Sequence, residues 1–115
     1  EQNYLALTIA LEALFVSKED NISKQLTNNT ARFLCEEITE RSQMQKFLRN
    51  MYTIRCKVAH GNIDALIRLL NKGDLFEKFL EYRAVVAEAL RRTYGLDKKA
   101  ILQDIRAKNK PAIES

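Results

Sequence analysis

Apolar side chains recur every three or four positions along most of the chain, which is the spacing of one face of an α-helix. Three glycines and a single proline, Pro111, interrupt this pattern, so the turn residues that many short strands would need are missing. The sequence therefore predicts an all-α, single-domain helical bundle of about five helices. The helical stretches cover about residues 3–17, 21–37, 43–60, 63–73 (a short one), 74–95 and 97–108.

Local signals predict where these helices begin and end. Asn21 and Asp74 have side chains that can cap the helices following them, and Ser42 with Gln45 fits a capping box. Glycine accepts the left-handed conformation that often follows a helix. The helix stops predicted on this basis are Gly61, Gly73 and Gly95.

Length and composition set the scale of the protein. With 115 residues, of which 46% are hydrophobic and 30% charged, the chain matches one soluble globular domain with one core. We expect that domain to cover residues 1–110 and a frayed tail to cover 111–115. Helical patterning starts almost at Glu1, which indicates a piece of a longer protein with further domains upstream.

Neither a membrane segment nor a metal cluster is visible in the sequence. No apolar run approaches the roughly 20 residues that span a bilayer, and no leader is recognisable, which predicts a cytoplasmic protein without a membrane partner. Cys35 and Cys56 are too few and too far apart for a zinc cluster. We expect two reduced thiols, mostly buried, with no metal and no cofactor.

Charge is distributed unevenly. The net charge is +4, and residues 91–110 alone carry seven basic and two acidic side chains, a local net charge of +5. Such a basic end favours a polyanionic partner, although a solvated basic helix is the commoner explanation.

A single arginine interrupts the apolar arc of the stretch 43–60. Arg55 falls inside an arc that is made by Met44, Phe47, Met51, Ile54 and Val58. The opposite, polar side carries Lys46, Arg49, Asn50, Thr53, Lys57 and His60. Arg55 and the lone histidine, His60, are about 140° apart on an ideal helix and do not share one face.

Glu12 poses the matching problem on the first stretch. Residues 3–17 are apolar nearly all round, which is typical of a buried helix, and Glu12 is the only charge inside them. Because an unpaired buried charge is costly, Glu12 and Arg55 are expected to satisfy one another. That pairing would be purely structural unless Arg55 also faces a polar groove.

His60 also permits two interpretations. A histidine at a helix end can simply bond the last carbonyls and interact with the helix dipole. Alternatively, its position at the end of a face that carries Lys46, Arg49 and Lys57 suits contact with a phosphate backbone.

The stretch "LRNMYTIRCKVAHG", Leu48 to Gly61, resembles the signature of the HEPN superfamily of α-helical domains, and within it the Apea-like group. The resemblance includes Tyr52 three residues before the arginine, the glycine directly after the histidine, and "ALEALF" with Glu12 upstream. It covers about Leu5 to Tyr94.

The resemblance implies a dimer that brings two such motifs to a shared cleft. Many members are metal-independent ribonucleases in toxin, phage-defence or RNA-processing systems, some held by an antitoxin or another regulatory protein. It assigns the catalytic roles to Arg55 and His60, with Glu12 and Tyr52 in support. The residue after the arginine is commonly polar in active members and is Cys56 here, which leaves an inactive dimerisation or nucleotide- or RNA-binding module as the alternative.

RNA cleavage by this pair of residues is chemically coherent. RNA carries its own nucleophile, the 2′-hydroxyl, so an acid–base group of near-neutral pKa and a cation that stabilises the phosphorane are sufficient. Histidine suits the first role, and the forked donors of arginine suit the second. The sequence shows no competing glycine-rich phosphate loop and no second histidine for a triad.

Overall fold

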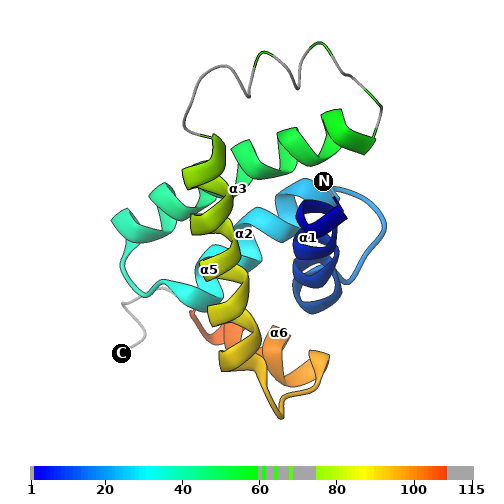
Figure 1. Cartoon of the computed structure of the whole chain (residues 1–115). Helices are drawn as coiled ribbons and strands as arrows, with labels where there is room; N and C mark the ends of the chain where they lie inside the picture. Colours follow the sequence, from blue (N-terminus) through cyan, green and yellow to red (C-terminus); the bar gives the residue numbers. More distant parts are fainter. Residues whose placement is uncertain (1, 60, 62–63, 65–67, 69–74, 109–115) are drawn as a thin grey trace.

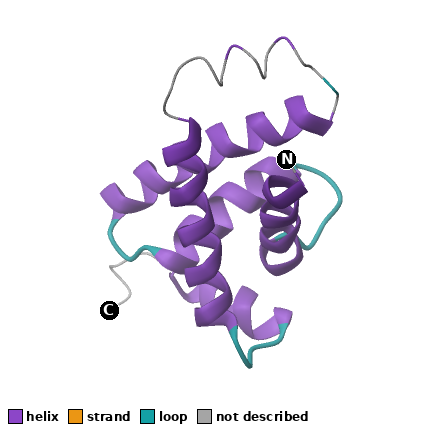
Figure 2. Ribbon diagram, in the orientation of Figure 1, coloured by secondary structure: helices purple, strands orange, loops and turns teal. Residues whose placement is uncertain are grey.

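The computed structural model describes residues 2–59, 61, 64, 68 and 75–108. The described residues form helices and loops, and none of them lies in a strand (Figures 1 and 2). The helices are α1 (Gln2–Phe15), α2 (Ile22–Leu34), α3 (Ile38–Ala59), α5 (Leu75–Thr93) and α6 (Lys98–Lys108). The predicted all-α bundle is therefore confirmed. The short helix predicted at 63–73 lies almost entirely outside the described residues, and the tail at 111–115 lies wholly outside them.

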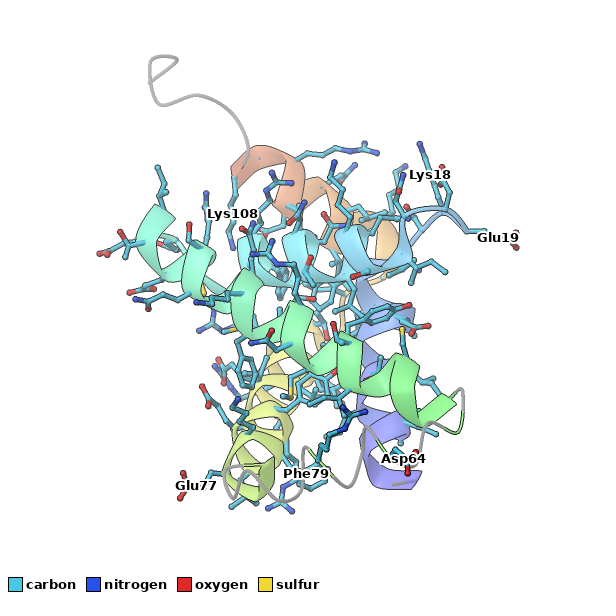
Figure 3. All side chains as sticks on the ribbon, turned by 90° about the horizontal axis from the view of Figure 1, so that it is seen from above. Lys18, Glu19, Asp64, Glu77, Phe79 and Lys108 are labelled. Atoms are coloured by element: carbon cyan, nitrogen blue, oxygen red, sulfur yellow. The ribbon has the colours of Figure 1, made fainter. Side chains whose placement is uncertain are left out.

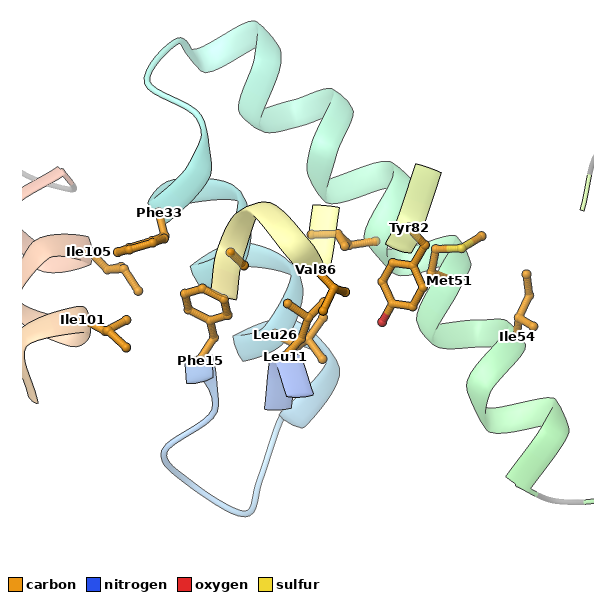
Figure 4. Packing of buried hydrophobic residues seen from close by; sticks show 12 residues of the cluster. Leu11, Phe15, Leu26, Phe33, Met51, Ile54, Tyr82, Val86, Ile101 and Ile105 are labelled. Atoms are coloured by element: carbon orange, nitrogen blue, oxygen red, sulfur yellow. The ribbon is translucent and has the colours of Figure 1, made fainter. Parts of the chain in front are cut away.

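The core forms where these helices meet. α2 packs along α3, α1 lies against α2 and α5, and α6 covers α1 and α2 at one end of the bundle (Figure 1). The most deeply buried apolar side chains in this core are Leu11, Phe15, Leu26, Leu48, Met51, Tyr82, Val86 and Ile101 (Figure 4). Full burial of one such side chain contributes about 1.5–3 kcal/mol. The ring centroids of Phe47 and Tyr82 lie 6.3 Å apart and join α3 to α5.

The prediction that α1 is buried on all sides is wrong. Leu11 and Phe15 are fully buried, but Ile9 is 57% exposed. The reason is that the other described helices pack against only part of the circumference of α1, and its apolar residues exceed what they can cover. Among the described helices, none combines the length and apolar character that crossing a bilayer demands.

The connection between α2 and α3 differs from the prediction. α2 ends at Leu34 rather than near residue 37, because Cys35 adopts an extended conformation with φ −117° and ψ 134°. α3 begins at Ile38 rather than near residue 43, and the amide of Arg41 already donates to the carbonyl of Glu37 at 2.9 Å. The predicted capping box at Ser42 is therefore wrong. No glycine or proline stands between residues 36 and 42, so nothing stops the helix from starting earlier.

The other predicted helix signals had mixed outcomes. Gly61 and Gly95 have positive φ, 66° and 81°, as expected after a helix end. Asn21 precedes α2 but makes no side-chain cap, because its own backbone is left-handed at φ 53°. Asp97, in contrast, caps α6 by accepting a hydrogen bond from the amide of Ala100 at 2.8 Å. Asp74 and Gly73 lie outside the described residues.

Basic residues near the C-terminal end of the chain donate hydrogen bonds to carbonyl groups at or just after the ends of other helices. Lys98 donates to the carbonyl of Val16, just after α1. The guanidinium of Arg92 donates to the carbonyl of Leu34 at 3.1 Å, and Lys108 donates to that of Phe33 at 2.9 Å. Cations at helix C-termini satisfy carbonyls that have no partner within the helix. Part of the basic charge predicted to favour a polyanion thus has a structural role.

Candidate functional site

The motif arginine belongs to the stretch of α3 that packs into the core. Met51, one turn before position 55, is fully buried, and the neighbouring Ile54 is only 7% exposed. The helical backbone includes Arg55, but its side chain lies outside what the structure describes. All of His60 lies outside the described residues as well. The relative placement of these two side chains therefore stays a prediction.

Glu12 lies on α1 beside a buried pair of hydroxyl groups. The hydroxyls of Thr8 on α1 and Tyr82 on α5 share a hydrogen bond of 2.8 Å, and these residues are 0% and 1% exposed. Glu12 is half-buried and stands one turn after Thr8. One side of α1 thus presents a carboxylate and a hydroxyl toward the helix that carries Tyr82.

The environment of Tyr82 is unfavourable for ionisation. Burial raises the pKa of its phenol to about 12, the hydrogen bond with Thr8 opposes that rise, and the negative charge of Glu12 adds to it. At neutral pH Tyr82 is therefore an uncharged hydrogen-bonding group. Its contribution to any chemistry is to position its neighbours rather than to transfer protons.

Sequence reasoning missed Thr8 and Tyr82. One signal was available, because Thr8 is the only hydroxyl in the apolar run from Leu5 to Leu11 and lies one turn from the charged Glu12. Nothing comparable marked Tyr82, which is separated from Thr8 by 74 positions.

Tyr52 and Cys56 lie one turn apart on α3, and both are half-buried. Tyr52 packs against the hydrophobic core. Cys35 and Cys56 are free thiols, and burial raises the pKa of the Cys35 thiol, which keeps it protonated and unreactive. The half-buried Cys56 contributes only weak hydrogen-bonding ability at the position after the arginine.

The outer face of α3 is polar and basic, as its periodicity predicted. Lys46, Arg49 and Thr53 are exposed, and within the described residues neither Lys46 nor Arg49 forms an ion pair. The side chain of Lys57 lies outside the described residues. From position 41 to position 63 the chain contains five lysines and arginines and no carboxylate. This face therefore has a positive charge that no neighbouring residue on the helix neutralises.

The described residues contain no group of three or more histidine, cysteine, aspartate or glutamate side chains arranged to hold a metal ion. Comparison of the chain with protein-family models, with curated proteins and with solved structures found no match. The HEPN resemblance therefore rests on the motif residues themselves.

Proposed function

We propose that this chain is a metal-independent endoribonuclease of HEPN type that works as a homodimer. The proposal rests on Lys46 and Arg49, which are both exposed on α3 and form no ion pair within the described residues. The same helix carries the arginine of the motif. Phosphate contacts of this kind fix the position of an RNA strand without reading its sequence.

The proposed reaction is a transesterification within RNA. His60 removes the proton of a 2′-hydroxyl, whose oxygen attacks the adjacent phosphorus. Arg55 stabilises the charge that develops on the phosphorane oxygens. The bond to the 5′-oxygen then breaks and that oxygen takes up a proton, leaving a 2′,3′-cyclic phosphate and a 5′-hydroxyl. The second copy supplies the matching motif to the shared cleft.

Glu12 has a supporting role in this proposal. Its carboxylate holds the guanidinium of Arg55, and the hydroxyl pair beside it restricts where that carboxylate can lie. A fixed arginine is pre-organised for the transition state and loses little entropy when the phosphate binds.

The proposal is tested by incubating purified protein with mixed RNAs in EDTA. We compare the wild type with Arg55→Ala and His60→Ala, and use Arg106→Ala, at an exposed position of α6, as the matched control. Removing an acid–base group costs about 10²–10⁴ in rate, and removing a group that stabilises the transition-state charge costs about 10²–10³. Both motif variants should therefore lose cleavage while the control keeps it. A wild type that cuts no RNA, or motif variants that cut equally well, would overturn the proposal.

A second candidate is a non-catalytic HEPN module that dimerises, or binds nucleotide or RNA, for an attached domain. Cys56 favours it, because a thiol replaces the polar group that commonly follows the arginine in active members. This module would bind an RNA probe and form a dimer in sedimentation experiments without cutting the probe. Membership of a toxin, defence or processing system, with an antitoxin or other regulatory protein as partner, belongs to either proposal.

A further inference from the structure

A polar hollow of about 340 Å³ lies beside the loop between α1 and α2. Its positively charged lining residues are Lys18 from the loop and Lys24 and Arg32 from α2, and its single carboxylate is Asp20. Figure 3 shows Lys18 at the edge of the molecule. None of these three cations forms an ion pair in the described part of the chain. The hollow thus has an excess of positive charge that the fold does not use.

The backbone around the hollow is held in place by amide side chains. Gln25 accepts from the amide of Ser17 at 3.0 Å and donates to the carbonyls of Lys18 and Asp20 at 2.9 and 2.7 Å. Asn29 donates to the carbonyl of Phe15 at 2.8 Å and fixes the end of α1 to α2. The loop therefore does not have to be ordered when a ligand arrives, which favours binding.

The cations line the hollow from two elements, the loop and α2. Lys24, Asn28 and Arg32 follow one another at intervals of one turn on α2, so the first and last are separated by about 12 Å along the helix. Lys18 approaches from the loop, so positive charge comes from two directions. Asn28 and Arg32 are half-buried, which limits the conformations their side chains must give up on binding.

The geometry points to a binding site for a small polyphosphate, a di- or triphosphate group recognised through its phosphate oxygens. Three unpaired cations against one carboxylate require a ligand with at least two negative charges, and Arg32 offers the forked donors that suit phosphate. The lining has no apolar or aromatic side chain, so it offers no surface on which a base could stack. This site does not depend on the proposed nuclease function.

The test is isothermal titration of the protein with inorganic tripolyphosphate at low salt and without metal ions. We expect saturable binding to the wild type, about tenfold weaker binding to Lys24→Gln and Arg32→Gln, and about twofold to fivefold tighter binding to Asp20→Asn. Lys99→Gln, which removes an exposed charge from α6, is the matched control and should bind as the wild type does. Circular dichroism confirms that each variant is folded.

Two results would overturn the inference. Absence of saturable binding is the first, and equal weakening by Lys99→Gln, which would indicate attraction to overall charge, is the second. Binding of a short RNA is measured in the same way. If RNA binding falls in Arg32→Gln while tripolyphosphate does not bind, the hollow contacts an RNA strand and the polyphosphate site is wrong. The double variant Lys46→Gln, Arg49→Gln should weaken RNA binding alone, which separates this site from the proposed nuclease face.

Discussion

Two polar clusters lie within two turns of one another on α5 and are built in opposite ways. Tyr82 is buried, and its hydroxyl shares a hydrogen bond of 2.8 Å with the hydroxyl of Thr8. Glu88 lies at the surface, where its carboxylate accepts hydrogen bonds from Arg91 at 2.6 and 2.9 Å and from Arg92 at 2.5 Å. The surface cluster joins charged groups, whereas the buried cluster joins neutral hydroxyl groups.

The contrast teaches that charge alone does not decide which cluster contributes more to the stability of the protein. Water competes for the charges around Glu88, and holding three long side chains in one geometry costs entropy, so the net contribution is small. The hydroxyl pair has no access to water, so water cannot replace the hydrogen bond when one member is removed. Because it is buried, the Thr8–Tyr82 pair should contribute more to the free energy of unfolding than the cluster around Glu88 does.

The largest expected effect concerns the charge beside the buried cluster. If the proposed pairing of Glu12 with Arg55 holds, Glu12→Gln and Arg55→Met should each destabilise the protein by about 3–5 kcal/mol, because each variant leaves the other charge without its partner. The double variant should lose far less than the sum. Denaturant melts of the four proteins measure the coupling, and Glu77→Gln, at an exposed position of α5, should change stability by no more than about 0.5 kcal/mol. Strict additivity would show that Glu12 and Arg55 do not interact.

Removal of the buried hydroxyl should have the next largest effect. Tyr82→Phe keeps the ring but removes a hydrogen bond from the core, where water cannot replace it, so we expect a loss of about 1–3 kcal/mol in denaturant melts. Tyr94→Phe is the matched control, because Tyr94 is 90% exposed and should show no measurable change. Adding Thr8→Val to Tyr82→Phe should recover part of the loss. Equal free energies of unfolding for Tyr82→Phe and Tyr94→Phe would contradict the importance of burial.

Alkaline pH should act on the same buried group. The pKa of Tyr82 is raised by burial from 10.0 to about 12, so the folded state holds this proton more tightly than the unfolded state does. The stabilisation is complete below pH 10.0 and is lost as the pH rises toward 12. Ultraviolet titration of phenolate should show a late ionisation step near pH 12, and Tyr82→Phe should remove that step. A late step that persists in the variant would assign the shifted pKa to another tyrosine.

A smaller loss of stability is expected where a lysine donates to a carbonyl near the C-terminal end of α2. Lys108 donates to the carbonyl of Phe33 and lies 5.2 Å from the centroid of that ring. Lys108→Met keeps the apolar stem and removes these two interactions and the surface ion pair with Asp104 at 3.1 Å, which should together cost about 1 kcal/mol in denaturant melts. Lys99→Met, at an exposed position of the same helix, should have no measurable effect. Indistinguishable variants would mean that water replaces the lysine at no cost.

The smallest effect is expected at the surface cluster. Hydrogen bonds from Arg91 and then Arg92 lower the pKa of Glu88 from 4.5 to about 2, so its stabilisation is present above pH 4.5 and disappears as the pH falls toward 2. Glu88→Gln should leave the melting temperature at neutral pH nearly unchanged and flatten its decline over this acidic range. Added salt should reduce the difference between the two proteins further. A large loss at neutral pH would reverse the ranking of the two clusters.

The candidate site was accessible to sequence reasoning only in part. Periodicity correctly separated the buried Met51 and Ile54 from the exposed Lys46 and Arg49 on α3. It also marked Glu12 as a charge in apolar surroundings. It did not reveal the Thr8–Tyr82 bond, because no local pattern relates residues that far apart. The roles of Arg55 and His60 come from the motif and remain predictions.

Local chemistry along the chain by itself determined that this protein is helical, which face of α3 is buried, and that Gly61 and Gly95 follow helix ends. These properties depend on neighbours within a turn or two, where side-chain spacing and backbone freedom decide the conformation. Only the tertiary structure decided which basic side chains form hydrogen bonds or ion pairs within the fold. Lys98 donates to a carbonyl 82 positions away, whereas Lys24 and Arg32 form no ion pair in the part of the chain that the structure describes. The physical reason is that a side chain finds a distant partner only after helix packing has brought the two together.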